Sequence, residues 1–245
     1  MVYPFFLYLS RKNLIINYSI MKKFTLFTFL LIFTAGFAQS DVIAITNETG
    51  DGTGMWVVQK GLDQKIKGSY YLFDGHMHTG VITVGGGKKY QVSNLNYNIK
   101  DDRLESRITA DSVYIFDSRN IVQVDFGDVK FRTLMNPEKY GLSFFEVIGS
   151  FNKKSLLKLH TLKIVEGMIN PMSHQKQTPD KFVKDTEYYV RDSSGEMEEF
   201  KLKKKTVLRF FNNISDEVDQ YASEHDLSFK DDEDLIRIFK KYATI

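Results

Sequence analysis

The chain contains no cysteine among its 245 residues. A disulfide framework, a thiolate zinc site, a catalytic thiol and a lipid-modified cysteine behind a leader are therefore all excluded. The folded protein has to be stabilised by the burial of apolar side chains, and a chain of this length can supply a sizeable core.

Basic and acidic residues are also nearly balanced over most of the chain. The first 38 positions hold four of the 33 basic residues and none of the 31 acidic ones, so the remainder carries a formal charge of −2. A nearly neutral body has no strong field for nucleic acid or for anionic lipid. We therefore expect no nucleic-acid partner.

The N-terminal region has the pattern of a secretory signal peptide at residues 21–38. Lys22 and Lys23 form its positive region, Phe24–Phe33 form its apolar region, and small side chains two positions apart end at Ala38. Signal peptidase requires small residues at such positions. We expect cleavage between Ala38 and Gln39, which predicts an exported protein, periplasmic or secreted.

Two alternatives concern the same region. Residues 1–20 place a second apolar stretch before the lysines, where a leader should begin with charge, and we interpret them as an over-extended start before Met21. The rival hypothesis is an uncleaved membrane anchor. The apolar run is shorter than the roughly 20 residues that a spanning helix needs, so we expect no membrane span after removal of the leader.

Beyond the leader, residues 55–202 alternate between apolar and polar side chains and are interrupted by turn residues every eight to twelve positions. This pattern predicts β-strands, and the short links between them favour an antiparallel meander. The expected strands are Met55–Val58, Val81–Val84, Tyr90–Val92, Leu95–Ile99, Leu104–Ile108, Val113–Phe116, Ile121–Phe126, Val129–Leu134, Leu142–Ile148, Ser155–Val165, Thr186–Arg191 and Met197–Leu202. Residues 170–180, with two prolines, are expected to form a long surface loop.

Three aromatic doublets indicate how this sheet is covered. Consecutive strand residues point to opposite faces, so each doublet should place one ring on each side of the sheet. The sheet should therefore be buried on both faces, by a second layer or by helices; an exposed aromatic stripe that binds sugar or lipid is the alternative. The doublets are Tyr70–Tyr71, Phe144–Phe145 and Tyr188–Tyr189.

The period changes to that of helices over residues 203–245. Leu235, Ile238, Phe239 and Tyr242 follow helical spacing, and Ser228 with Asp231 has the spacing of a capping box. Ser215 is the expected N-cap of a helix before this one. Strands followed by helices predict an α+β fold, in which short C-terminal helices pack on a curled or sandwich-like sheet within a single mature domain, residues 39–245.

His76 and His78 are the only closely spaced histidine pair. Two imidazoles one residue apart on a strand point the same way and can share a metal ion, but no third ligand has convincing spacing. A polar loop leading into the next strand explains the same residues. We keep His76 and His78 as candidate metal ligands, with the plain loop as the alternative.

The remaining polar motifs have simpler explanations. Gly50–Gly54 and Gly85–Gly87 lack the spacing of a phosphate-binding loop, and the latter suits a hairpin turn. We interpret the basic run Lys201 and Lys203–Lys205 as a solvent-exposed junction between a strand and a helix. No serine stands in the frame of a nucleophile elbow, so no catalytic residue is assigned and no cofactor is expected.

Several stretches resemble a family of uncharacterised exported bacterial proteins. The pieces that carry the resemblance are Gly68–Leu72, Gly87–Tyr90, Leu95–Ile99 with Leu104–Glu105, Phe145–Val147, Tyr188–Tyr189 and the Lys203–Lys205 run. These are turns and alternating strands, with low specificity. The resemblance implies export and a β-rich fold, and it implies no activity and no catalytic residues.

Together these patterns predict a non-catalytic exported protein that binds a surface ligand or an envelope protein, with no oligomeric state indicated. The alternative hypothesis is a hydrolase, metal-dependent or otherwise, with His76 and His78 at its site.

Overall fold

A computed structural model describes residues 66–242 together with the strand backbones at 42–44 and 54–58. The chain divides after Asp41, and every feature described below belongs to the second unit, Val42–Ile245. The cleavage residues Ala38 and Gln39, and with them the signal peptide, lie outside the described residues, so that prediction stays untested.

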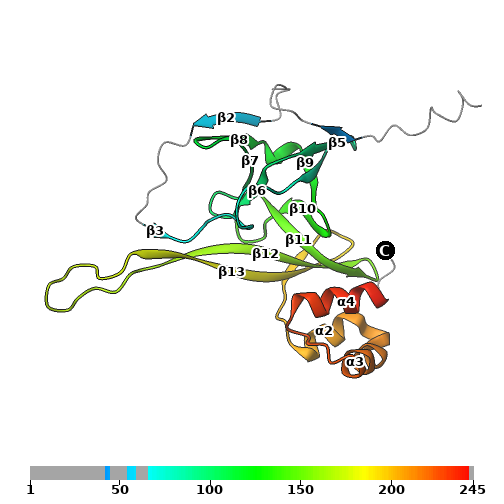
Figure 1. The fold of residues 1–245 in the computed structure, drawn as a ribbon. Coiled ribbons are helices and arrows are strands. Elements are labelled where there is room, and N and C mark those ends of the chain that lie inside the picture. Colours follow the sequence, from blue (N-terminus) through cyan, green and yellow to red (C-terminus); the bar gives the residue numbers. More distant parts are fainter. Residues whose placement is uncertain (1–41, 45–53, 59–65, 243–245) are drawn as a thin grey trace, which may run out of the picture. The chain divides into compact units, whose positions relative to one another are not determined.

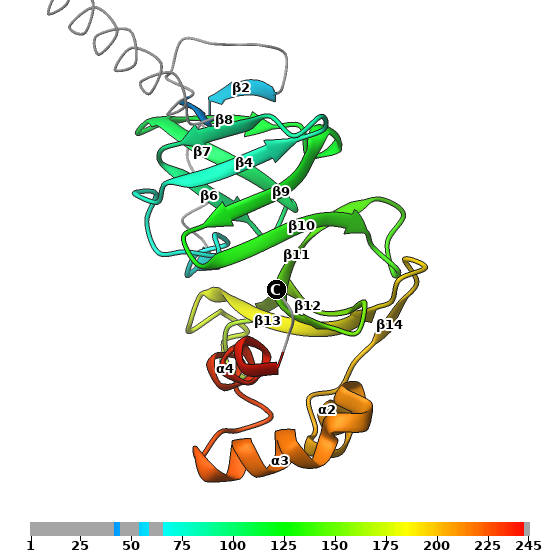
Figure 2. The same ribbon diagram turned by 90° about the vertical axis from the view of Figure 1, so that its right-hand side faces the viewer.

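The strands form two sheets, as Figures 1 and 2 show. The larger sheet has the order β1-β5-β4-β9-β10-β11-β12-β13-β14, with β3 also paired to β13, and the smaller has the order β2-β8-β7-β6. The strands are β1 Val42–Ala44, β2 Gly54–Val58, β3 Ile66–Lys67, β4 Gly80–Val84, β5 Lys89–Val92, β6 Leu95–Asn98, β7 Arg103–Thr109, β8 Ser112–Phe116, β9 Ile121–Phe126, β10 Val129–Met135, β11 Leu142–Phe151, β12 Lys154–Val165, β13 Asp180–Arg191 and β14 Met197–Glu199.

The predicted α+β class is confirmed, and most neighbouring strands are antiparallel, as short hairpin links require. The expected hairpin turn at Gly85–Gly87 joins β4 to β5, with Gly86 and Gly87 at positive φ. Two pairings differ from a simple meander: β1 with β5 and β3 with β13 are parallel. Both join short N-terminal strands to distant segments, which local alternation cannot indicate.

One core lies between the two sheets. It combines residues of the smaller sheet, such as Tyr97 and Leu104, with residues of the larger one, such as Val124 and Phe131. All four are at most 2% exposed. This is the second layer that the aromatic doublets predicted for part of the larger sheet.

The doublets in β11 and β13 behave as predicted. Phe144 lies in the core between the sheets whereas Phe145 lies on the opposite face, and Tyr188 packs against the helices whereas Tyr189 joins Phe145. For Tyr70–Tyr71 the prediction was wrong. These residues precede β4 outside any regular strand, and their rings contact each other, with centroids 4.5 Å apart.

The helices α2 (Lys204–Phe211), α3 (Ser215–Glu224) and α4 (Asp232–Tyr242) pack on the β11–β13 part of the larger sheet (Figure 1). Their apolar faces meet Ile148 and Leu156 in a second core. None of the helices in the described part of the chain combines the length and the apolarity needed to cross a bilayer.

Both predicted caps are displaced. Ser215 is the first residue of α3 and makes no side-chain cap; Ile214 precedes the helix. At α4 the capping residue is Asp231, whose carboxylate accepts the backbone N–H of Asp234, one turn later than the Ser228–Asp231 box predicts. Asp231 competes successfully because its carboxylate also interacts favourably with the helix dipole.

A buried ionic cluster joins α4 to the sheet. Glu146 accepts a hydrogen bond of 2.6 Å from His160, and Lys158 lies between Glu146 and Asp232, the first residue of α4. Tyr188 donates to Asp232 at 2.7 Å. Burial would raise the pKa of Glu146, but His160 and Lys158 outweigh it and the net pKa is lowered.

Candidate functional site

A pocket of about 380 Å³ forms where the segment after β3 crosses the outer face of the smaller sheet. Backbone hydrogen bonds hold this segment to β6: Leu72 donates to Tyr97, and Ile99 donates to Tyr70. We call it the His76 pocket; its lining residues are Ile66, Gly68, Ser69, Tyr70, Tyr71, Gly75, His76, Lys100, Arg107 and Phe182.

The two asparagines of β6 bond the segment and the floor beneath it. Asn96 donates to the carbonyls of Phe73 and Gly75 and accepts the N–H of Phe73. Asn98 donates to Glu105 at 2.8 Å. Alternation at 95–99 is typical of a half-buried strand, but both asparagines are buried: Asn96 is covered by the segment that it bonds, and Asn98 is bonded to Asp101 and Glu105.

The His76 side chain in the lining is only 8% exposed. Its ring meets the Tyr71 ring edge-on, with centroids 4.3 Å apart. Its Nδ1 is buried and has no hydrogen-bond partner among the described residues. Burial, reinforced by the charge of Arg107, lowers the pKa of His76 to about 4, so the imidazole is neutral at pH 7.

Arg107 supplies the positive charge of the pocket. It lies on β7 at a bulge between Arg107 and Thr109, and its Nε is buried without a partner in the part of the chain that the structure describes. The ammonium-bearing Lys100 lines the same cavity. Buried polar atoms are nearly always hydrogen-bonded in native proteins, so unpaired nitrogens on two side chains that line one pocket indicate missing acceptors or donors.

Glu105 stabilises the floor beside them. Its carboxylate is 0% exposed and accepts hydrogen bonds from Tyr71 at 2.6 Å, from Asn98, and from Arg103 at 2.6 Å. Residues 103, 105 and 107 alternate along β7, so all three point to the outer face. Arg103 compensates the charge of Glu105 directly.

The walls of the pocket are aromatic. Tyr70 meets Phe182 of β13 edge-on at 5.9 Å between centroids and lies against Tyr71. Burial raises the pKa of Tyr70, which keeps its hydroxyl neutral.

His78, the second predicted ligand, does not line this pocket. Its Nε2 lies 3.0 Å from the carbonyl oxygen of Asp74, and its ring packs on Phe73 rather than on Tyr71. The two histidines precede β4 and are not on a strand, so the alternation that would point them the same way does not apply. Among the described residues no group of three His, Cys, Asp or Glu side chains could hold a metal, and the metal site stays a prediction.

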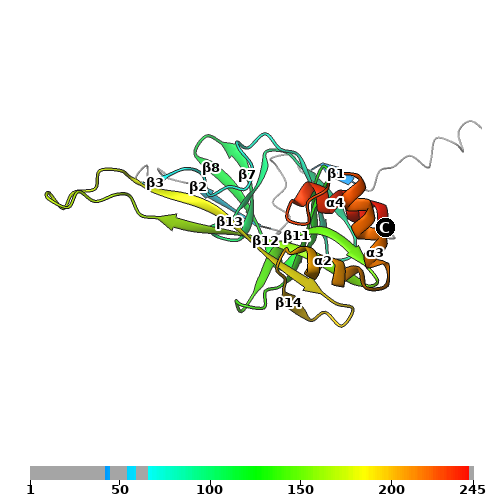
Figure 3. The ribbon, with the colours of Figure 1, turned by 90° about the horizontal axis from the view of Figure 1, so that it is seen from below.

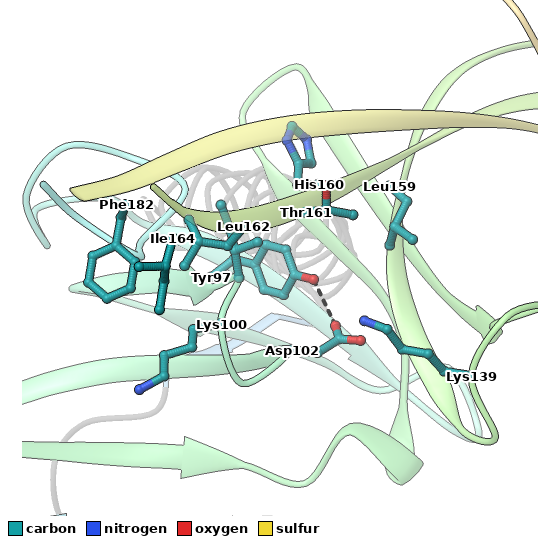
Figure 4. Close-up of a pocket in the computed structure, with 11 residues that line it drawn as sticks. Tyr97, Lys100, Asp102, Lys139, Leu159, His160, Thr161, Leu162, Ile164 and Phe182 are labelled. Carbon is teal, nitrogen blue, oxygen red and sulfur yellow. Dashed lines mark hydrogen bonds between the residues drawn. The ribbon is translucent and has the colours of Figure 1, made fainter. Parts of the chain in front are cut away.

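A second, smaller cavity of about 160 Å³ shares Lys100 and Phe182 with the His76 pocket (Figure 4). The Tyr97 hydroxyl in its lining is already engaged, because it donates to Asp102 at 2.7 Å. Leu159, Leu162 and Ile164 contribute apolar side chains to the lining. The His76 pocket is the better candidate of the two because it is lined by His76 and Arg107, each with a buried nitrogen that has no partner among the described residues.

The low pKa of His76 has a measurable consequence. The unfolded chain binds a proton here with a pKa near 6.5 and the folded chain only near 4, so the stability contributed by neutral His76 is present above pH 6.5 and is lost as the pH falls towards 4. His76→Phe should therefore flatten the loss of stability between pH 6.5 and 4, as measured by urea unfolding. In an NMR titration of the wild type, the imidazole whose signals are lost in His76→Phe should still be neutral at pH 5. An unchanged acid dependence, with that imidazole charged at pH 5, would contradict this.

Sequence reasoning found His76 but missed Arg107 and Glu105. The predicted strand 104–108 assigned its apolar side to the core, and the same alternation places the three charged residues 103, 105 and 107 together on the other side. Three charged residues on one side of a strand are a signal that this side carries a polar site. The segment that covers them could not be predicted from the neighbouring sequence, because it begins more than 25 residues earlier in the chain.

Comparisons with protein-family models, with curated proteins and with solved structures give no match. The resemblance to exported proteins therefore stays a prediction, and the chemistry of the pocket has to be argued from its own residues.

Proposed function

We propose that this chain is an exported, non-catalytic binding protein that holds a small organic anion with a flat apolar body in the His76 pocket. The observation that carries the proposal is that His76 and Arg107 line one cavity, and that each has a buried nitrogen, His76 Nδ1 and Arg107 Nε, without a partner among the described residues. A bound carboxylate would accept hydrogen bonds from both.

The chemistry of these groups favours a carboxylate in particular. A guanidinium matches the planar geometry of a carboxylate, and hydrogen bonds between charged groups are stronger than those between neutral ones. A neutral imidazole can donate from Nδ1 without adding a second buried charge. Tyr70, Tyr71 and Phe182 offer ring faces and edges to the rest of the ligand.

Binding of benzoate tests the proposal, with benzyl alcohol as the uncharged analogue of the same shape. We expect measurable heat of binding for benzoate and at least tenfold weaker binding for benzyl alcohol. Arg107→Gln should weaken benzoate binding at least tenfold, because a hydrogen bond to a charged group contributes about 1.5–3 kcal/mol. Isothermal titration calorimetry provides the measurement.

Arg209→Gln is the matched control, since it removes the same charge from the exposed surface of α2. It should leave benzoate binding unchanged. Equal binding by wild type and Arg107→Gln would exclude the pocket as the anion site. Turnover of an ester by the wild type that is lost in His76→Ala would instead favour the hydrolase hypothesis with His76 and His78.

Export rests on the leader pattern at Met21–Ser40 alone. Mass spectrometry of the native protein should find Gln39 at its N-terminus, and the protein should fractionate outside the cytoplasm. An intact Met21 on a cytosolic protein would contradict this part of the proposal and leave the pocket unaffected.

A further inference from the structure

The hairpin of β12 and β13 extends past β11 as an arm (Figures 1 and 3), and β3 pairs with the outer end of β13. The pairing of β12 with β11 stops at Leu159, whereas the pairing of β12 with β13 continues to Val165 and Lys181. Residues 164–178 end this arm, and we call them the hairpin tip.

Exposed apolar side chains gather on the hairpin tip. Five of the nine large hydrophobic residues that are exposed in the described part of the chain lie in this short stretch, and Met168 and Met172 are 66% and 93% exposed. Apolar clusters that remain in water usually mark a contact surface. The five residues are Ile164, Val165, Met168, Ile169 and Met172.

The apolar residues of the tip are not confined to one face. Ile164 and Val165 are consecutive strand residues and point to opposite sides, and both are exposed. A patch that docks on a flat protein surface needs only one apolar face. Exposed apolar side chains on both faces of a narrow tip suit an apolar medium that encloses them.

Several backbone N–H groups at the tip are bonded internally. Met168 N–H donates to Thr178 Oγ1, and Gln177 N–H donates to the carbonyl of Met168. The N–H groups of Met172 and Ser173 donate to Asn170 Oδ1. Any segment that enters hydrocarbon has to satisfy its backbone in this way, because no water is available there.

Charged side chains in and below the tip are paired. Lys176 pairs with Asp180 at 2.6 Å, and Lys163 pairs with Asp185 farther down the arm. The residues 164–178 hold only Glu166 and Lys176 as formal charges. Paired opposite charges suit the headgroup zone of a bilayer, and the lack of net charge argues against adsorption by electrostatic attraction.

We propose that the hairpin tip inserts into the apolar zone of a lipid bilayer and thereby holds the exported protein at a membrane surface. The insertion is shallow and is driven by burial of the Met and Ile side chains. It rests on residues separate from the His76 pocket, so it can fail or succeed independently of anion binding.

The absence of cysteine allows a local test with the full chain. An environment-sensitive nitrobenzoxadiazole dye on Met172→Cys should gain fluorescence at least threefold on addition of phosphatidylcholine vesicles, and doxyl-labelled lipids should quench it. The gain should be the same at 0.1 M and 0.5 M NaCl, since the contact is apolar. The matched control is the dye on Met77→Cys, a methionine of equal exposure, 93%, outside the tip, which should show neither effect.

A second pair of variants tests whether the fluorescence gain depends on the apolar side chains of the tip and not on the dye alone. Met168→Ser with Ile169→Ser should abolish the gain at position 172, whereas Met135→Ser, at a methionine of 65% exposure, should preserve it. Absence of a gain in the labelled wild-type background would overturn the proposal. So would an unchanged gain in the Met168→Ser, Ile169→Ser variant, or a tip-dependent complex with a protein in place of vesicle binding.

Discussion

Replacing Glu105 by alanine is expected to lower the free energy of unfolding by about 3–5 kcal/mol, the usual cost of removing one partner from a buried ion pair. The carboxylate is fully buried and accepts hydrogen bonds from Tyr71, Asn98 and Arg103. Its loss leaves those donors without their acceptor beneath the His76 pocket. Urea unfolding at pH 7 measures the change.

Two further variants make this prediction specific. Glu105→Gln keeps the shape and one acceptor oxygen but not the charge, so its loss should be clearly smaller than that of Glu105→Ala. Glu198→Ala, on the exposed face of β14, should change stability by less than about 0.5 kcal/mol. A loss below about 1 kcal/mol for Glu105→Ala would show that the carboxylate does not support the floor of the pocket.

Replacing Gly149 by alanine is the second change with a large expected effect. A Cβ at this position would lie 2.6 Å from Cβ of Phe239 and still closer to its ring. Phe239 is buried between Phe210 and Phe211 and cannot move away freely. Overpacking of this kind costs about 1–3 kcal/mol, and here it displaces α4 from β11.

Gly85→Ala is the matched control, because its Cβ would meet nothing within 4 Å. It should leave the unfolding midpoint nearly unchanged. In a double-mutant cycle, Gly149→Ala should be less harmful in a Phe239→Ala background, since the small side chain makes room. Strictly additive effects of the two substitutions would contradict the proposed clash.

Much of the fold follows from the alternation of side chains. Ile121–Phe126 was predicted with its observed bounds, and the Phe144–Phe145 doublet correctly indicated a sheet buried on both faces. β13 was predicted to begin at Thr186 but begins at Asp180, because its polar first half pairs with β12 in the arm. The pairing partner, and not the composition, makes that stretch a strand.

The candidate site was less accessible from the sequence. His76 stood out because histidines are rare in this chain, but its proximity to His78 suggested a metal, whereas its packing on Tyr71 is what defines its environment. Alternation did not indicate that Asn96 and Asn98 are both buried. Asn96 is covered by a segment without its own periodicity, which it bonds, and Asn98 is bonded to Glu105.

The most direct test of the central proposal is an NMR titration with benzoate that follows the arginine Nε–H signals and the imidazole signals of the folded chain. We expect the Arg107 Nε–H and the His76 ring to show the largest shifts, saturating together at one affinity, while Arg209 and His225 stay unchanged. Shifts of exposed arginines without Arg107, or no saturable shift at all, would contradict an anion site in the His76 pocket.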